Sequence, residues 1–327
     1  MPLEGGFNAE EAKQFLEICY QVQDTRAKKK DAPRTPDPYF PEEFPKVPQP
    51  SDWKKYYAPE SSFPPGDNYF EIWQSTEKSY RFVVCFRGTV NTIGSILEDA
   101  VLTMIPAEVK FKLGGKEHCI RLANDPRARV HTGFTLGLGS MLPDLLLQLE
   151  LILGLSPEPE LFITGHSQGA ALATLCTSFL NYQKLYTLRP VSLKTYVFAQ
   201  PKPGNDYYGY DFEYLTANNS VVNSRGFRVT NNQDWVAQGP LTIQLPSDLS
   251  IPNILTATGI YSKYPLLQKV IEALEKIELP STLNYFGCGT PILLKGDPGC
   301  NPKNADDFMW QHYLRQYYKL LIEQFPV

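Results

Sequence analysis

A serine flanked by glycines, between a strand-like and a helix-like segment, constrains the fold of this chain more than any other feature. Residues 165–169 read Gly-His-Ser-Gln-Gly, with Ser167 at the centre. The apolar run 161–164 predicts a strand before this motif, and the alanine-rich run 170–176 predicts a helix after it. So sharp a turn strains the serine backbone and requires glycine two positions before and after it. The hydroxyl is then exposed at the top of a sheet, as an acyl-transfer nucleophile must be.

Strand-like and helix-like segments alternate along the rest of the chain. This alternation predicts an α/β fold with a mostly parallel central sheet and helices on both faces. Asn8 and Glu11 resemble a capping box at the start of the first helix. Strands are expected at Tyr69–Trp73, Tyr80–Phe86, Leu161–Thr164, Leu193–Ala199 and Gly226–Thr230, and helices at 8–26, 136–153 and 266–277.

The 327 residues are expected to form a single domain, residues 1–327. Residues 1–66 would supply the N-terminal helix and a wrapping segment, because 33–65 hold ten of the 28 prolines and are not expected to pack as a regular element. Residues 240–282 read as an insertion that precedes a C-terminal helix, and 90–112 as a candidate lid.

Charge and hydropathy exclude some classes of function. The net charge of −4 with mixed signs gives no electrostatic reason to bind nucleic acid. The richest apolar stretch, 142–155, is short and interrupted by polar residues, and the N-terminus lacks the pattern of a secretory signal. The sequence therefore favours a cytoplasmic protein, or a secreted one if a leader was removed. Cys19, Cys85 and Cys176 are expected to be buried free thiols. Cys288 and Cys300 are the pair placed to form a disulfide, although the weak secretory signal disfavours the bond.

A serine hydroxyl needs a basic partner and an acid that orients that partner. On an α/β-hydrolase fold the chain order is serine, acid, histidine, and His312 is the one histidine after Ser167. His312 is therefore the expected base. Asp234 follows the strand 226–230 after a short turn and is favoured as the acid, with Asp206 as the alternative.

An oxyanion site needs two backbone N–H donors. One would come from Gln168, the residue after the serine. The other is expected at Thr89, just after the strand that ends at Phe86, where Gly88 permits close approach of the backbone and the Thr89 hydroxyl could donate as well. Arg87 is expected to be structural. No metal or organic cofactor is required by this chemistry.

Several short motifs agree with a known family in their order and approximate spacing. From about residue 70 to the C-terminus, though patchily between 234 and 285, the chain resembles the class 3, or fungal-type, lipases of the α/β-hydrolase fold. The resemblance rests on Phe86–Thr89, Val130–Phe134, Gly165–Gly169, Phe198–Asn205, Arg228–Val236, and His312 with Tyr317.

The resemblance implies a role for each matching residue. Ser167 is similar to the family's nucleophile, Asp234 to its acid, His312 to its base, and Thr89 and Gln168 to its oxyanion donors. His131 matches a structural position, and His166 flanks the nucleophile without acting as the base. The family commonly has Leu-Gly-Gly after the serine, whereas this chain has Gln-Gly-Ala.

These features lead to the expectation of a lipase that cleaves carboxylic esters of lipids, acylglycerols above all, at a lipid–water interface or membrane surface. Phospholipase A1 or galactolipase activity on the same site is an alternative, and a non-catalytic lipid-binding scaffold is another. A helical apolar stripe ending before Pro106 coincides with the family's lid, although a fixed surface helix would show the same pattern. The predicted lid residues are Ile93, Ile96, Leu97 and Val101.

Overall fold

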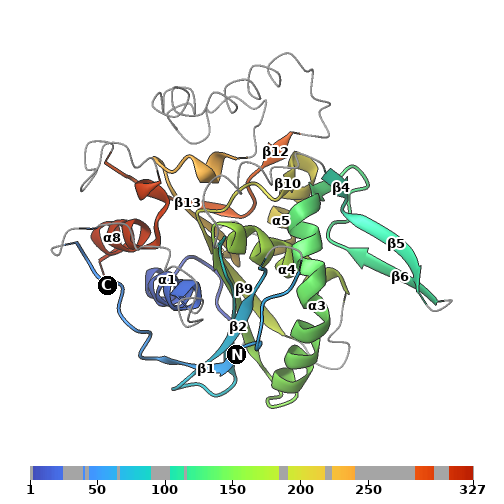
Figure 1. The fold of residues 1–327 in the computed structure, drawn as a ribbon, viewed down its shortest axis with the longest axis horizontal. Helices are drawn as coiled ribbons and strands as arrows, with labels where there is room; N and C mark the ends of the chain where they lie inside the picture. Colours follow the sequence, from blue (N-terminus) through green and yellow to red (C-terminus); the bar gives the residue numbers. More distant parts are fainter. Residues whose placement is uncertain are drawn as a thin grey trace.

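The computed structural model describes residues 3–24, 40, 44–64, 67–89, 104–113, 116–183, 191–217, 223–239, 284–297 and 309–326. The strands of their largest sheet are β1 (Trp53–Tyr57), β2 (Phe70–Ser75), β3 (Arg81–Phe86), β8 (Glu160–His166), β9 (Ser192–Phe198), β11 (Gly226–Asn231) and β13 (Thr290–Leu294). They lie in the order β1-β2-β3-β8-β9-β11-β13 (Figure 1). The strands from β3 onward run parallel, and β2 and β1 extend one edge antiparallel. The predicted mostly parallel sheet is confirmed.

Helices cover both faces of this sheet. On one face lie α1 (Ala9–Asp24) and α8 (Leu314–Gln324), which contact each other, and on the other lie α3 (Thr132–Leu153), α4 (Gln168–Gln183) and α5 (Asp206–Thr216) (Figure 1). Side chains of β3 alternate between the two cores: Val84 packs with α3 and α4, and Val83 packs with α1 and α8. Because both faces are buried, the strand sequences are continuously apolar rather than alternating.

Two smaller sheets flank the central one. The first contains β4 (Met104–Pro106), β7 (Arg129–His131), β10 (Gly204–Asn205) and β12 (Tyr285–Phe286), and the second is the hairpin of β5 (Glu108–Leu113) and β6 (Lys116–Arg121). The helical stripe that the sequence predicts up to Pro106 is wrong at its last two residues, because Met104 and Ile105 lie in an edge strand paired with β7. Adjacent apolar residues fit either element, and an edge strand tolerates Pro106. The predicted lid residues Ile93, Ile96, Leu97 and Val101, and the insertion 240–282 with its predicted helix, lie outside the described residues.

The proline-rich segment contributes a strand that the sequence reading missed. Trp53–Tyr57 pairs with β2 at the edge of the central sheet, and Trp53 is buried. The stretch from Ser51 to Ala58 has no proline and is rich in aromatic residues, so it can supply backbone N–H groups to the sheet.

Helix α1 begins as predicted, but only half of the expected capping box forms. The Asn8 Oδ1 accepts from the Glu11 N–H at 2.9 Å. The Glu11 carboxylate instead accepts from Lys194 Nζ and Tyr196 O–H, each at 2.7 Å, and thereby ties the start of α1 to β9.

Four cysteines are buried free thiols: Cys19, Cys85, Cys176 and Cys288. This confirms the prediction for the first three. Cys288 is free as well, and Cys300 lies outside the described residues.

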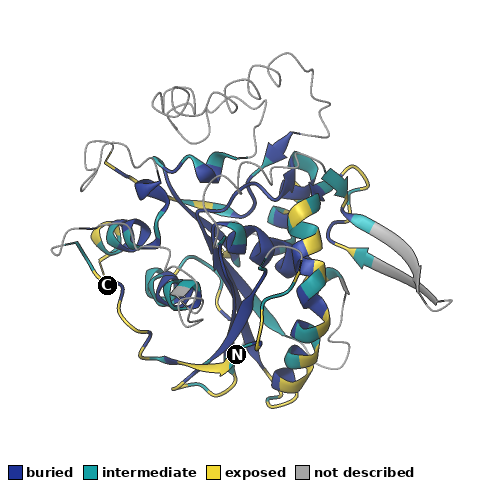
Figure 2. Cartoon of the chain, in the orientation of Figure 1, coloured by how far each residue is buried: buried dark blue, intermediate teal, exposed yellow. Residues whose placement is uncertain are grey.

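Helix α3 is the one described helix whose length and hydropathy would suit a membrane span. Of its most apolar window, 44% is buried inside the protein, and its inner face packs against α4. Leu136, Leu147 and Leu151 are exposed on its outer face, which Figure 2 shows as yellow turns along the helix. The contacts of the buried face identify α3 as part of the core on that side of the sheet.

Candidate active site

The turn between β8 and α4 has the geometry that its sequence predicts. Ser167 has a φ angle of 58°, in the left-handed region that a side chain rarely adopts. A Cβ atom on Gly165 would overlap the Gly169 carbonyl oxygen, and one on Gly169 would overlap the carbonyl oxygen of Phe86 in β3. Glycine is therefore required at both positions, because the helix leaves the sheet in contact with the neighbouring strand.

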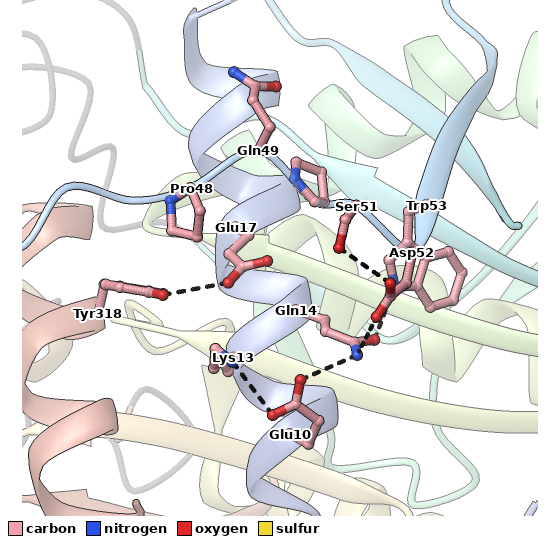
Figure 3. A pocket seen from close by; sticks show the side chains of 11 residues that line it. Glu10, Lys13, Gln14, Glu17, Pro48, Gln49, Ser51, Asp52, Trp53 and Tyr318 are labelled. Carbon is pink, nitrogen blue, oxygen red and sulfur yellow. Dashed lines mark hydrogen bonds and ion pairs between the residues drawn. The ribbon is translucent and has the colours of Figure 1, made fainter. Parts of the chain in front are cut away.

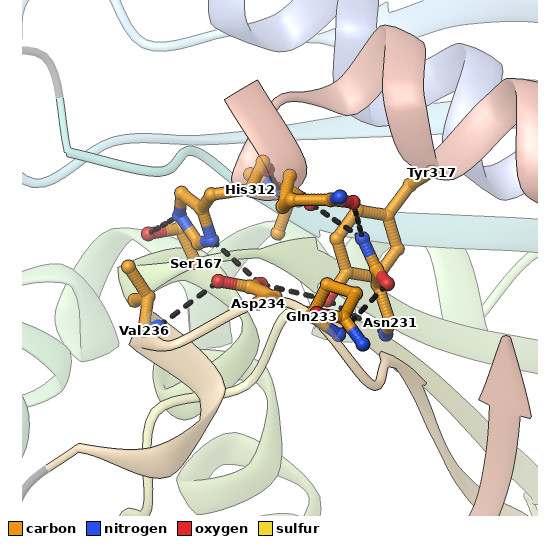
Figure 4. Close-up of polar contacts among 9 residues, drawn as sticks. Ser167, Asn231, Gln233, Asp234, Val236, His312 and Tyr317 are labelled. Carbon is orange, nitrogen blue, oxygen red and sulfur yellow. Dashed lines mark hydrogen bonds and ion pairs between the residues drawn. The ribbon is translucent and has the colours of Figure 1, made fainter. Parts of the chain in front are cut away.

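Three side chains from distant parts of the chain meet at this turn (Figure 4). Ser167 Oγ lies 2.9 Å from His312 Nε2, and His312 Nδ1 lies 2.8 Å from Asp234 Oδ2. A carboxylate oxygen can only accept, so Nδ1 carries the imidazole proton and Nε2 accepts the serine O–H. All three residues are buried. The arrangement is the one in which a histidine can remove the serine proton.

Asp234 is held by more than the histidine. It lies just beyond the carboxyl end of β11, and its Oδ1 accepts the Val236 N–H at 3.0 Å. Its Oδ2 accepts the Tyr317 O–H at 2.7 Å in addition to His312 Nδ1. Burial, together with the neighbouring carboxylate, raises the pKa of Tyr317 well above its usual value, so the phenol remains a donor. Asp206, the alternative acid, is the first residue of α5, where its N–H donates to the Asn284 carbonyl.

Tyr317 belongs to the motif with His312, but its sequence context alone predicts no role for it. Its spacing after His312 puts it on α8, and the apolar pattern of that helix would have been the signal that it points inward. It also accepts the Asn231 N–H at 3.1 Å, so it joins the end of β11 to the acid.

Two further histidines are structural. His166 Nε2 donates to the His312 carbonyl oxygen at 2.8 Å, with the two rings 4.7 Å apart. Burial, and then the nearby His312, lower the pKa of His166 well below its usual value, so it stays neutral. His131 caps α3 by accepting the Phe134 N–H, and burial lowers its pKa to about 4.

The structure brings Thr89 and Gln168 together beside Ser167. A Cβ atom on Gly88 would lie 3.5 Å from Ser167 Cβ, which shows how closely the loop after β3 approaches the nucleophile. Gln168 is the first residue of α4, where backbone N–H groups have no partner within the helix. The Thr89 hydroxyl donates to Gln168 Oε1 at 2.9 Å, so its proton is engaged by a side chain.

Arg87 has a structural position, as expected. Its guanidinium donates to the Asp67 carbonyl at 2.7 Å and lies over the Tyr69 ring.

A separate polar pocket of about 220 Å³ lies between α1, the segment 48–53 and Tyr318 (Figure 3). Its lining includes Glu10, Lys13, Glu17 and Asp52 and none of the three residues that meet at the serine turn. Among the described residues, no group of three or more His, Cys, Asp or Glu side chains is arranged to hold a metal ion.

The sheet order, the strained serine turn and the Ser167–His312–Asp234 contacts define an α/β-hydrolase fold with the arrangement of a serine hydrolase. Residues 83–243 match the family described as lipase (class 3). This match to the class 3 lipase family confirms the resemblance recognised in the motifs.

The similar curated proteins and solved structures are also lipases. The chain is 35% identical over 98 residues to the secreted mono- and diacylglycerol lipase A of Penicillium cyclopium and of Penicillium camembertii. This match covers 30% of the chain and spans only 28% of the length of these curated relatives.

A Rhizomucor miehei lipase deletion mutant in complex with its propeptide superposes with a TM-score of 0.52 and 16% identity, over 88% of this chain and 67% of that one. The lipase of Rhizopus microsporus var. chinensis gives a TM-score of 0.49 and 22% identity, over 71% and 69% of the two chains. The first of these likenesses supports the α/β-hydrolase fold.

Proposed function

We propose that this protein is a lipase, a carboxylic ester hydrolase that cleaves lipid esters through an acyl-enzyme. Ser167 is the nucleophile, His312 the general base and Asp234 the acid that orients the imidazole. The observation that carries this proposal is the unbroken chain of hydrogen bonds from Ser167 Oγ through His312 to Asp234, at 2.9 and 2.8 Å.

The reaction follows from these contacts. His312 Nε2 takes the proton as Ser167 Oγ attacks the ester carbonyl, and the imidazolium that forms is stabilised by the Asp234 carboxylate. The backbone N–H groups of Thr89 and Gln168 donate hydrogen bonds to the former carbonyl oxygen and stabilise its negative charge. His312 then protonates the leaving alcohol, and water repeats the sequence on the acyl-enzyme. None of these steps uses a metal or an organic cofactor.

Acylglycerols are the substrate class that the comparisons favour, since the curated relatives are named as mono- and diacylglycerol lipases. The partner is then a lipid–water interface or a membrane surface, contacted transiently. A panel of acylglycerols, phospholipids, galactolipids and p-nitrophenyl esters of graded length tests this choice. Highest kcat/KM on a phospholipid or galactolipid would identify the protein as a phospholipase A1 or galactolipase on the same site.

The test of the chemistry is Ser167→Ala. We expect this change to reduce hydrolysis of a short p-nitrophenyl ester by about 10⁴-fold or more while the protein still folds. The wild type should be labelled by a fluorophosphonate at Ser167, and the variant should not. Retention of a tenth of the wild-type turnover, or a wild type that resists labelling, would reject the proposal and favour a non-catalytic scaffold.

A further inference from the structure

The last turn of α1 reaches the loop that carries Thr89. The Gln23 side chain makes two hydrogen bonds to the backbone of this loop. Its Nε2 donates to the Thr89 carbonyl oxygen at 3.0 Å, and its Oε1 accepts the Gly88 N–H at 3.1 Å. The Gln23 amide therefore binds the backbone N–H of Gly88 and the backbone carbonyl of Thr89.

The peptide that lies between these two anchored groups contains the Thr89 N–H. This N–H makes no hydrogen bond within the described part of the chain. Glycine is needed at residue 88, because a Cβ there would lie 2.9 Å from the His166 carbonyl oxygen. Glycine also has the greatest backbone freedom of any residue, so the peptide could rotate its N–H away from the serine. Anchoring the groups on both sides of the peptide removes that freedom.

The residue that makes this clamp is itself held firmly. Phe15, Leu16 and Val22 of α1 are completely buried against the sheet. The Phe15 ring lies 4.8 Å from the ring of Phe162 in β8, the strand that ends at the serine turn. The position of Gln23 is thus fixed relative to Ser167 through the core on this face.

A second set of hydrogen bonds holds the Thr89 side chain. Thr89 Oγ donates to Gln168 Oε1 at 2.9 Å, and Gln168 Nε2 donates to Asn68 Oδ1 at 3.2 Å. These two hydrogen bonds fix the Thr89 hydroxyl, whereas Gln23 binds the backbone of the loop.

We propose that Gln23 is a positioning residue for the oxyanion site, which fixes the Gly88–Thr89 peptide so that the Thr89 N–H is aimed at the oxygen that becomes negative in the transition state. The inference rests on the proposed function. It also makes α1, which precedes the residues 83–243 matched by the family, a working part of the catalytic site.

The test is Gln23→Leu, which keeps the bulk of the side chain and removes both hydrogen bonds. We expect kcat for a short p-nitrophenyl ester to fall about 10- to 100-fold, somewhat less than the loss of an oxyanion donor itself. KM and the pH midpoint of kcat/KM should be unchanged, because His312 and Asp234 are untouched. Phenylboronic acid bonds to the serine oxygen as a tetrahedral anion, so its Ki should rise by a factor similar to the fall in kcat.

Gln14→Leu is the matched control. Gln14 lies on the same helix, and its amide likewise bridges other groups, donating to Glu10 and Asp52 and accepting from Trp53. We expect its kcat and Ki to equal those of the wild type. Gln23→Glu is a second variant in case the leucine disturbs folding. It keeps an acceptor for the Gly88 N–H but sets an oxygen against the Thr89 carbonyl, and we expect it also to lose kcat at an unchanged Tm.

Wild-type kcat and Ki in both Gln23 variants would overturn the inference. An equal loss in Gln14→Leu, accompanied by a lower Tm, would overturn it too, because α1 would then act through stability alone. Ser167→Ala measured in parallel separates this failure from that of the proposed function. If Ser167→Ala remains active, the proposed serine chemistry is wrong. If Ser167→Ala is inactive and both Gln23 variants keep wild-type activity, only the role of Gln23 is wrong.

Discussion

At the scale of single residues, the proton relay depends on one oxygen atom. Asp234 Oδ2 accepts from both His312 Nδ1 and Tyr317 O–H, so the acid, the base and the phenol are coupled. Removing any one of them changes the environment of the other two.

We therefore expect His312→Ala and Asp234→Asn to be strongly non-additive. Each should reduce kcat/KM by about 10³-fold or more, and the double variant should be hardly worse than His312→Ala, because both changes disable one proton transfer. Steady-state kinetics on a soluble ester measures this. Asp206→Asn is the control, and its activity should stay within about threefold of wild type. If Asp206→Asn greatly reduced kcat/KM and Asp234→Asn reduced it only slightly, the choice of Asp234 as the acid would be wrong.

The polar pocket beside α1 contains a carboxyl group that opposes folding at high pH. Glu17 is 6% exposed and accepts the Tyr318 O–H at 3.3 Å (Figure 3). Burial raises its pKa from 4.5 to about 7, with Lys13 acting in the opposite direction and Glu10 and Asp52 adding to the increase. Its folded pKa is above its unfolded pKa, so the folded state binds the proton more tightly. The contribution to stability is complete below about pH 4.5 and is lost as the pH rises through 7.

Glu17→Gln should therefore stabilise the protein at pH 8.5, by about 1–2 kcal/mol after allowing for solvent screening, and have little effect at pH 5. Urea unfolding of the two proteins at both pH values measures the difference. Glu77→Gln is the control, because Glu77 is exposed and its charge is not among those that act on Glu17. A gain in stability that is the same at both pH values would show that the Glu17 charge is not its cause.

At the scale of elements, the crossing of α4 over β3 depends on the absence of a side chain. Gly169→Ala would drive a methyl group into the Phe86 carbonyl, and we expect a loss of more than about 3 kcal/mol or a failure to fold. Gly139→Ala in α3 is the control, because a Cβ there meets nothing within 4 Å. It should gain up to about 1 kcal/mol from helix propensity. Thermal unfolding measures both, and a stable Gly169→Ala would refute the close packing.

Local patterns were sufficient to predict the elements that bury continuous apolar runs. The strands β2, β3, β8, β9 and β11 and the helices α1, α3 and α4 lie close to their predicted positions. Local patterns do not predict elements whose structure is determined by pairing with a distant segment. Met104 and Ile105 continue a helical stripe in the sequence, but they form a strand with Pro106 that pairs with β7. The two-residue strands β10 and β12 are likewise too short to leave a pattern.

The same limit applies to the candidate site. Ser167, His312 and Asp234 could be chosen from turn chemistry and chain order, and the structure brings the three together. The hydrogen-bond partners of Gln23 and Tyr317 could not be predicted from the sequence. A side chain that forms a hydrogen bond with a backbone group or carboxylate far along the chain leaves no local sequence pattern.

At the scale of the whole molecule, the lid remains a prediction about an interface. If the predicted stripe that contains Ile93, Ile96, Leu97 and Val101 acts as a lid, specific activity should rise when an ester substrate exceeds its solubility, because an apolar helix face gains from contact with lipid. Ile96→Asp and Leu97→Asp should then impair activity on emulsions far more than on dissolved short esters. Ser95→Asp, on the polar side of the predicted stripe, is the control. A smooth hyperbolic rate curve through the solubility limit would favour a fixed helix.

The distances along the chain between the relay residues have a consequence for biosynthesis. Ser167 and His312 are 145 positions apart, and His312 follows the last strand of the central sheet. A ribosome delivers the chain from its N-terminus, so Ser167 and Gln23 are synthesised before His312 and before α8, the helix that α1 contacts. The nascent protein would contain the nucleophile without its base and would not hydrolyse esters. Translation timed against fluorophosphonate labelling should therefore show reactivity appearing only after residue 312 has emerged and docked.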